Sequence, residues 1–130
     1  MITTKIKNIL LLIVRLIIAV IFIYAGWAKV SAMAQTIGFF SKIGIPAFLA
    51  YITGYTEFIG GILLALGLWS EWVATVLAII MGFAVYFTYG GGFQSFSMPL
   101  VTLAGLLSII ASGSGAYAIK LKRKIETINS

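Results

Sequence analysis

Two charged side chains stand in segments that are otherwise apolar. Arg15 lies near the middle of the first apolar run of the chain, and Glu57 lies near the middle of the second. A charge at the centre of a membrane helix costs about 2.5–3.5 kcal/mol, so neither side chain is expected to face lipid. Consecutive membrane helices run antiparallel, which can bring the two charges together at one depth. We therefore predict a buried Arg15–Glu57 ion pair.

Small residues next to both charges favour close helix contacts. At 100° per residue, Arg15 shares a stripe with Ala19, Phe22, Gly26 and Lys29, and Glu57 shares one with Ala50, Thr53, Gly54, Gly60 and Gly61. Two further small-residue stripes are Ala74, Ala78 and Gly82, and Ala104, Ser108 and Ser112. Small residues let helix backbones approach closely in a membrane, so we interpret these stripes as packing surfaces.

The predicted pair has two interpretations, and the sequence leaves both open. A buried pair can fix the register of two helices, because loss of one partner leaves the other buried and uncompensated. An intramembrane ionisable residue is also a functional hypothesis in its own right. In that case Arg15 and Glu57 face a cavity between helices. Its expected lining is aromatic: Phe22, Tyr55, Phe58, Phe83 and Tyr86.

The elements that position these residues are membrane helices. Of the 130 residues, 62% are hydrophobic and 9% are charged, whereas soluble domains carry about 25% charged residues. A hydrocarbon core of about 30 Å requires about 20 apolar residues per helix. Four segments meet this requirement, at about residues 7–27, 46–68, 72–89 and 99–119. We predict an all-α fold, an integral membrane four-helix bundle formed as a single domain over residues 1–130.

Prolines and polar residues set the expected limits of the spans. Pro46 and Pro99 suit the first turn of a helix, so the second and fourth spans are expected to begin there. Residues 68–71 predict a tight turn. The longer connection over residues 31–45 is expected to contain a short amphipathic helix, around Phe39 and Phe40, at the membrane interface.

The basic residues predict the orientation of the chain. The formal net charge is +6, and the basic residues near the two termini are Lys5, Lys7, Lys120, Lys122, Arg123 and Lys124. The opposite side would hold only Lys29 and Lys42. The excess of positive charge predicts that both termini are cytoplasmic. Its position beside apolar segments favours contact with anionic lipid headgroups and not with nucleic acid.

The first span also has features of a cleaved signal peptide, because Ala32-Met33-Ala34 has the form of a cleavage site. Its apolar run is too long for the core of a signal peptide, however, and it contains Arg15. We therefore expect the span to be retained.

The composition excludes several kinds of catalytic site. The chain has no cysteine and no histidine, which excludes thiol catalysis, cysteine- or histidine-ligated metal sites and a Ser-His-Asp triad. No metal site and no catalytic residues are expected, and the isolated chain has no catalytic motif that would make it an enzyme. No cofactor is evident from the residues, and a quinone is the cofactor left open.

A series of short motifs resembles the DoxX family of small four-helix bacterial membrane proteins. In chain order they are Gly26-Trp27-Ala28-Lys29-Val30, Ile43-Gly44-Ile45-Pro46, Glu57-Phe58-Ile59-Gly60-Gly61, Leu66-Gly67-Leu68 and Gly113-Ser114-Gly115-Ala116-Tyr117. The family is similar to the small subunit of an archaeal thiosulfate:quinone oxidoreductase, and some members are associated with membrane redox or oxidative-stress complexes. Its pattern also places an Arg and a Glu at the positions of Arg15 and Glu57. The resemblance implies a multi-pass protein of a bacterial or archaeal cell (inner) membrane.

The chain departs from the family pattern near the ends of its last two spans. Relatives often have a His where this chain has Phe87, Thr88 and Tyr89, and a Pro where it has Ser114. Redox chemistry that depends on those groups is not expected here.

Three functions follow from these observations. The first is an accessory subunit of a membrane redox or oxidative-stress complex, which implies a protein partner. The second is a quinone- or lipid-binding protein that uses Arg15 and Glu57. The third is a small transporter, for which one ion pair supplies little polar lining unless the chain forms a homo-oligomer.

Overall fold

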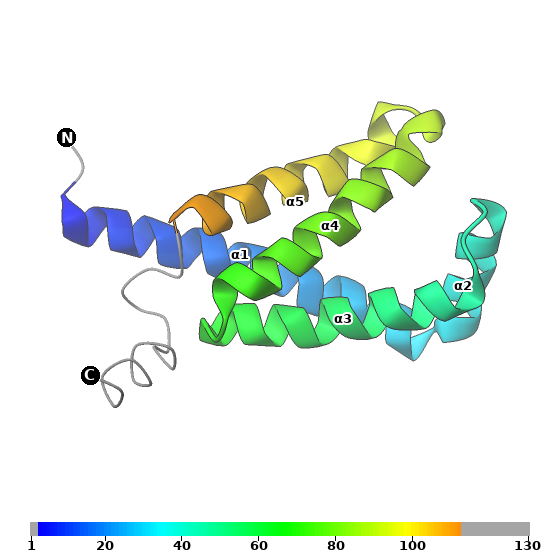
Figure 1. The fold of residues 1–130 in the computed structure, drawn as a ribbon, viewed down its shortest axis with the longest axis horizontal. Helices are drawn as coiled ribbons and strands as arrows, with labels where there is room; N and C mark the ends of the chain where they lie inside the picture. Colours follow the sequence, from blue (N-terminus) through cyan, green and yellow to red (C-terminus); the bar gives the residue numbers. More distant parts are fainter. Residues whose placement is uncertain (1–2, 113–130) are drawn as a thin grey trace.

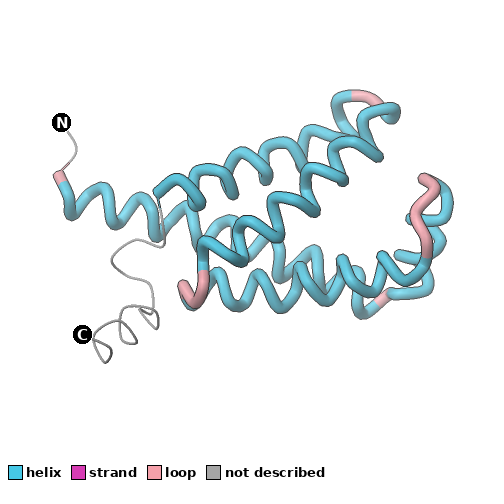
Figure 2. Tube along the Cα trace, viewed as in Figure 1, coloured by secondary structure: helices cyan, strands magenta, loops and turns pink. Residues whose placement is uncertain are grey.

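The computed structural model describes residues 3–112, and every element within that range is helical (Figures 1 and 2). The elements are α1 (Thr4–Ser31), α2 (Met33–Lys42), α3 (Ala47–Leu66), α4 (Ser70–Thr88), the 3₁₀ turn η1 (Tyr89–Gly91) and α5 (Phe93–Ser112). Within this part of the chain, four helices, α1, α3, α4 and α5, are long and apolar enough to cross a membrane. This confirms the predicted all-α fold with four spans. The chain is a multi-pass membrane protein.

The spanning helices form two antiparallel pairs. Helix α1 packs mainly against α3, and α4 packs mainly against α5. In Figure 1 the two pairs lie close together near the α3–α4 turn and diverge toward the end that carries α2 and η1. The predicted amphipathic helix is present as α2, and it covers the α3 side of this wider end.

Small residues allow α1 and α3 to approach closely, as the stripes predicted. A Cβ atom built on Gly26 would lie 2.6 Å from the Cα atom of Phe58, and one on Gly61 would lie 2.8 Å from the backbone nitrogen of Ile23. Real Cβ atoms essentially never come that close to another heavy atom. The α1–α3 contact therefore depends on glycine at these two positions.

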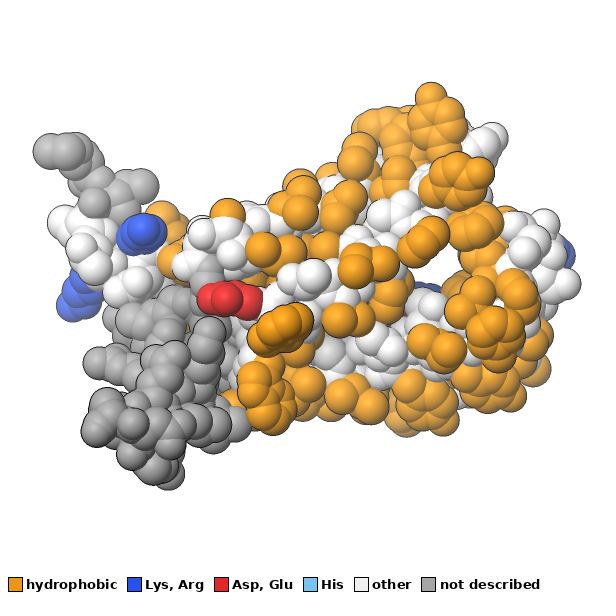
Figure 3. Space-filling model, viewed as in Figure 1, with side chains coloured by type: hydrophobic (Ala, Val, Ile, Leu, Met, Phe, Trp, Pro, Cys, Tyr) orange, Lys and Arg blue, Asp and Glu red, His pale blue; other side chains and the backbone are white. Residues whose placement is uncertain are grey.

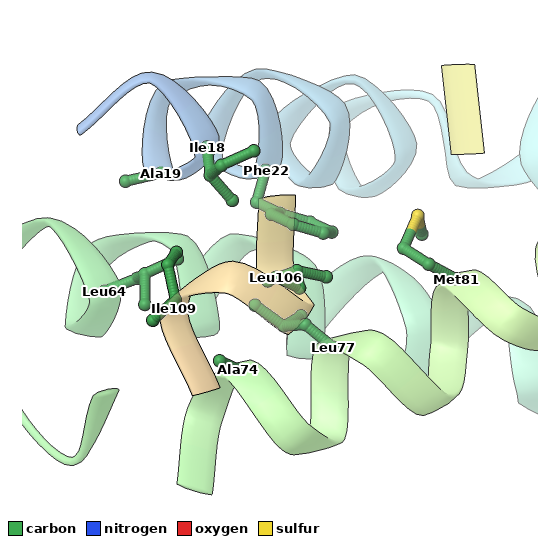
Figure 4. Close-up of a cluster of buried hydrophobic side chains, with 9 residues drawn as sticks. All are labelled: Ile18, Ala19, Phe22, Leu64, Ala74, Leu77, Met81, Leu106 and Ile109. Atoms are coloured by element: carbon green, nitrogen blue, oxygen red, sulfur yellow. The ribbon is translucent and has the colours of Figure 1, made fainter. Parts of the chain in front are cut away.

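The two pairs meet in one cluster of buried side chains (Figure 4). The cluster comprises Ile18, Ala19, Phe22, Leu64, Ala74, Leu77, Met81, Leu106 and Ile109. Leu64 and Ala74 lie on either side of the α3–α4 turn and are fully buried. The firm contact between the pairs is therefore at this end of the molecule.

The α3–α4 turn closes with a glycine in the left-handed region. Gly67 has a φ of 76°, and its N–H donates to the carbonyl of Leu64 at 3.1 Å. The N–H of Leu68 donates to the carbonyl of Leu63 at 3.0 Å, which completes the usual capping pattern of a helix C-terminus. Trp69 then takes a φ of 48° before α4 begins. The turn predicted at residues 68–71 begins one residue earlier.

Helix α5 differs from the prediction in its start and in its buried face. It begins at Phe93, and Pro99 lies inside it. A proline inside a spanning helix is tolerated when neighbouring groups satisfy the freed carbonyl. The packed face consists of Thr102, Leu106 and Ile109, whereas Ala104, Ser108 and Ser112 are exposed. The prediction that Ala104, Ser108 and Ser112 form a packing surface is therefore wrong for the contacts within this chain. The predicted end of the span at residues 113–119, and the motif at residues 113–117, lie outside the described residues.

Candidate functional site: an ion pair in an apolar cavity

The buried acid of α3 pairs with a lysine of α1. The Nζ atom of Lys29 lies 2.9 Å from the Oε2 atom of Glu57 and donates a hydrogen bond to it. The side chain of Glu57 is 2% exposed and that of Lys29 is 27% exposed. Lys29 lies in the last turn of α1, while Glu57 lies near the middle of α3. A buried carboxylate thus has a charged partner that reaches it from the end of the neighbouring helix.

The prediction that Glu57 pairs with Arg15 is wrong about the partner. Arg15 and Lys29 are 14 residues apart on α1 (29 − 15), which is about 21 Å at a rise of about 1.5 Å per residue. Helix α1 has 28 residues and α3 has 20. Gly54 lies opposite Lys29, because a Cβ built on Gly54 would contact the Cβ of Lys29 at 3.3 Å. The second half of α1 therefore faces α3, and the midpoints of the two helices are not level.

Arg15 lies on the predicted stripe but at a different depth. It is buried, with 3% of its surface exposed, on the face of α1 that also buries Ala19 and Phe22. A role in ligand binding for Arg15 or for Glu57 stays a prediction.

The Lys29–Glu57 pair forms part of the wall of a cavity of about 610 Å³. Sites for small organic ligands have volumes of about 300–1,000 Å³. All four spanning helices contribute to the wall, as do α2 and the α2–α3 connection. Figure 3 shows the molecule hollowed between the α4–α5 pair and the α2–α3 side, with hydrophobic side chains around the opening. The cavity is therefore the space left where the two pairs diverge.

The wall of the cavity is apolar except for a few groups. The apolar lining is Ile21, Phe22, Ala25, Phe39, Phe40, Ile43, Ile45, Leu49, Ile52, Ile79, Ile80, Met81, Phe83, Ala84, Phe87, Met98 and Pro99. The polar lining is Lys29, Thr53, Glu57, Thr88 and Thr102. A ligand of this cavity would therefore be mainly apolar with a small polar group.

Two of the five aromatic residues predicted to line a cavity do so. Phe22 and Phe83 are part of the wall, whereas Tyr55, Phe58 and Tyr86 are not. Tyr55 and Tyr86 point outward and are 49% and 75% exposed. Phe58 packs against Trp27, with ring centroids 5.9 Å apart. The prediction was based on closeness to the charges along the sequence. It did not consider the helix face on which each aromatic residue lies, and that face decides whether the residue reaches the cavity.

Lys29 and the threonines of the wall are site residues that were not predicted from the sequence. Lys29 shares a stripe of α1 with Arg15, and that stripe is the signal in the sequence that identifies it. Thr88 and Thr102 donate their hydroxyl hydrogens to the carbonyls of Ala84 and Met98, at 2.6 and 2.8 Å. These hydroxyl oxygens remain able to accept a hydrogen bond from a ligand.

The ion pair gives the cavity both a donor and an acceptor without net charge. An ammonium group carries three hydrogens, and a carboxylate carries two oxygens, so one Nζ–Oε2 bond leaves capacity on both partners. The arrangement suits a neutral ligand with carbonyl or hydroxyl groups. Among residues 3–112 no group of three His, Cys, Asp or Glu side chains could hold a metal ion.

Comparisons with known proteins agree with this architecture. The family model described as DoxX matches residues 10–90. The chain is 28% identical over 120 residues to "Inner membrane protein YqjF" of Escherichia coli, covering 88% of this chain and 92% of the relative. It is 39% identical over 70 residues to "Putative oxidoreductase CatD" of Bacillus subtilis, covering 54% and 52% of the two chains. A protein of Haemophilus influenzae described as "Uncharacterized protein" is 32% identical over 117 residues, covering 83% and 86%. No solved structure matches the chain.

Proposed function

This chain belongs to the DoxX family, and on that premise we propose that it is an inner-membrane component of a redox system that binds a quinone in its cavity. The observation that carries the proposal is the Lys29–Glu57 pair in a cavity whose wall is otherwise almost entirely apolar. Burial of a charged pair is costly. Its position in the wall of a ligand-sized space favours a role in recognition over a purely structural one.

A quinone has the chemistry that this wall would recognise. Its isoprenoid chain is apolar and suits the aliphatic and aromatic lining. A ring carbonyl of the oxidised form accepts a hydrogen bond, which Lys29 can donate. A hydroxyl of the reduced form donates a hydrogen bond, which Glu57 can accept. The pair is therefore able to hold either redox state of the ring.

In the proposed redox role, a protein partner supplies the electrons that reduce the quinone. Reduction of a quinone to a quinol takes two electrons and two protons. The chain has no cysteine and therefore no dithiol of its own to supply the electrons. A relative is named as a putative oxidoreductase, which supports membership of a redox complex. In this proposal the chain is an accessory subunit that presents the quinone to its partner.

The first test is mass spectrometry of the organic extract of protein purified gently from membranes. Wild-type protein is compared with Glu57→Gln and with Glu71→Gln, a matched substitution at an exposed acid in the first turn of α4. We expect about one quinone per chain in the wild type and in Glu71→Gln, and a several-fold loss in Glu57→Gln. A defined lipid in place of the quinone would assign the cavity to lipid binding. Absence of any enriched molecule from folded wild type would refute both.

The partner is tested separately from the ligand. Protein expressed at its natural level is cross-linked in membranes, purified through an affinity tag and analysed for bound proteins. We expect a reproducible membrane or membrane-attached oxidoreductase. If the chain is recovered alone but with its quinone, the result would support quinone binding and refute the accessory role.

A further inference from the structure

The cavity has a mouth formed by hydrophobic residues of four helices. Six residues of the wall are also solvent-exposed in the isolated chain: Phe39, Ile52, Ile79, Phe83, Phe87 and Met98. Their exposed fractions range from 37% at Phe87 to 61% at Phe83. All six are apolar, while the polar residues of the wall are buried or half-buried. The cavity is thus apolar at its mouth and polar only inside.

The depth of this mouth decides which medium it meets. Ile79 is the tenth of the 19 residues of α4, about 13 Å from the start of the helix at about 1.5 Å per residue. Half of a hydrocarbon core is about 15 Å. Ile79 therefore lies at the depth of the acyl chains, and the mouth extends from there toward the end of α4, where Phe87 is the eighteenth of the 19 residues. Glu57, the eleventh of the 20 residues of α3, lies at a similar distance from the start of its own helix.

The end of the cavity nearest the membrane surface is covered on the α3 side. Phe40 of α2 is 8% exposed, and Ile43 and Ile45 of the following connection are half-buried parts of the same wall. The hydroxyl of Thr36 on α2 lies 3.2 Å from the carbonyl oxygen of Lys29 on α1 and 3.1 Å from that of Ala32, so its single hydrogen is shared between them. The α2 segment therefore shields the ion pair from the nearer aqueous phase.

From these observations we propose that the mouth opens sideways into the hydrocarbon of the bilayer, so that the site takes up neutral molecules with a long apolar chain directly from the membrane. The inference rests on the proposed function for the identity of the ligand but not for its route. A charged, water-soluble molecule would have to lose its hydration to pass six apolar side chains. The site therefore excludes free anions and cations, although its polar group is an ion pair.

Spin labels on single cysteines provide the test, because the chain contains no cysteine. Thr53→Cys and Ala25→Cys place labels inside the cavity, and Phe83→Cys places one at the mouth. Two positions outside the cavity serve as references, Val20→Cys on the exposed face of α1 and Glu71→Cys beyond the end of α3. The labelled protein is freed of bound quinone and reconstituted into vesicles without quinone, where collision with oxygen reports access from lipid and collision with a nickel chelate reports access from water.

We expect the interior labels and the Phe83 label to collide with oxygen as the Val20 label does, and with the nickel chelate several-fold less than the Glu71 label does. Nickel access at Thr53 and Ala25 would overturn the proposal by showing an aqueous route. Low access of both reagents would also overturn it, because the mouth would then be closed or covered by a second copy of the chain. Two interior labels are used so that a folding defect in one variant does not decide the result.

The same experiment separates this inference from the proposed function. If the interior is accessible to oxygen and not to nickel but no quinone is found in the organic extract, the lateral mouth stands and quinone binding fails. If the extract contains quinone while the interior is accessible to nickel, quinone binding stands and the lateral route fails. Addition of a short-chain quinone to the labelled protein is expected to lower oxygen access at Thr53 several-fold and to leave Val20 unchanged.

Discussion

At the scale of single residues, the Lys29–Glu57 pair has an energetic role that is separable from ligand binding. Glu57 is 1% exposed, so removal of Lys29 leaves a carboxylate in an apolar wall. Loss of one partner of a buried pair costs about 3–5 kcal/mol. We expect Lys29→Met to fall near the lower end of that range, because the lysine is partly exposed. Unfolding in mixed detergent micelles measures the change.

A double-mutant cycle tests whether the two residues interact. The combined variant Lys29→Met/Glu57→Gln carries no charge at the site and is expected to lose less stability than the sum of the two single variants. Lys42→Met, at an exposed lysine in the last turn of α2, is the control and is expected to change stability by less than about 0.5 kcal/mol. Additive losses in the double variant would mean that the pair contributes no interaction energy.

The sequence indicated the burial of Glu57 but not its partner. A carboxylate in an apolar run must be buried, and the small residues around it marked the face that packs. The partner was inferred from span midpoints, which is sound only when two helices have equal length and level ends. Helix α1 continues to Ser31. As a result, Lys29 lies near the depth of Glu57, and Arg15 lies several turns away from it along the helix.

At the scale of helices, the α1–α3 contact depends on the absence of a side chain at Gly26. A Cβ there would overlap the backbone of Phe58, which cannot move without shifting α3. Gly26→Ala is therefore expected to destabilise the protein by about 1–3 kcal/mol, the usual cost of overpacking. The same assay of unfolding measures this loss.

Gly82→Ala is the matched control for that substitution. Gly82 also lies within a spanning helix, and a Cβ there would meet no atom within 4 Å. Alanine is favoured over glycine in a helix by about 1 kcal/mol, so this variant is expected to be as stable as the wild type or more stable. Equal losses at Gly26 and Gly82 would show that the close α1–α3 approach is not what the glycine provides.

The stripes predicted the α1–α3 contact well and the α5 contact poorly, for a physical reason. A small residue permits close approach but does not specify which helix approaches. On α3 the small residues coincide with a buried acid, and two independent signals then indicate one face. On α5 the small residues Ala104 and Ser108 are exposed, and the larger side chains of Leu106 and Ile109 provide the core. The cavity could not be predicted in the same way. Its size and position depend on how far the helices diverge, and the periodicity of the residues carries no information on that divergence.

At the scale of the whole molecule, the even number of spans determines on which side of the membrane each end of the helical bundle lies. With four spans in residues 3–112, the start of α1 and the end of α5 lie on the same side of the membrane. The basic residues at both termini predict that this side is the cytoplasm. Reporters that are active only in the cytoplasm, fused in turn to each terminus, are expected to be active at both. Activity at one terminus alone would contradict the four-span topology.

The divergence of the two helix pairs predicts how a ligand affects the stability of the whole protein. The pairs share a core near the α3–α4 turn, while the cavity separates them elsewhere. A ligand that contacts α1 and α3 on one side and α4 and α5 on the other adds contacts that the unfolded chain lacks. Binding to the folded state alone stabilises it by about 2.7 kcal/mol at a ligand concentration 100-fold above Kd.

After removal of bound quinone, addition of short-chain quinone is therefore expected to raise the Tm of the wild type and of Glu71→Gln in a concentration-dependent manner. The rise should be absent, or shifted to much higher concentration, in Glu57→Gln, because that variant lacks the carboxylate charge that positions the Lys29 ammonium, the donor to the ring carbonyl. Thermal unfolding followed by circular dichroism measures the difference. An equal rise in all three proteins would mean that the quinone acts through the detergent or lipid and not through this cavity. If the Tm rises only in the wild type and Glu71→Gln, the quinone stabilises the protein by occupying the cavity between the two helix pairs.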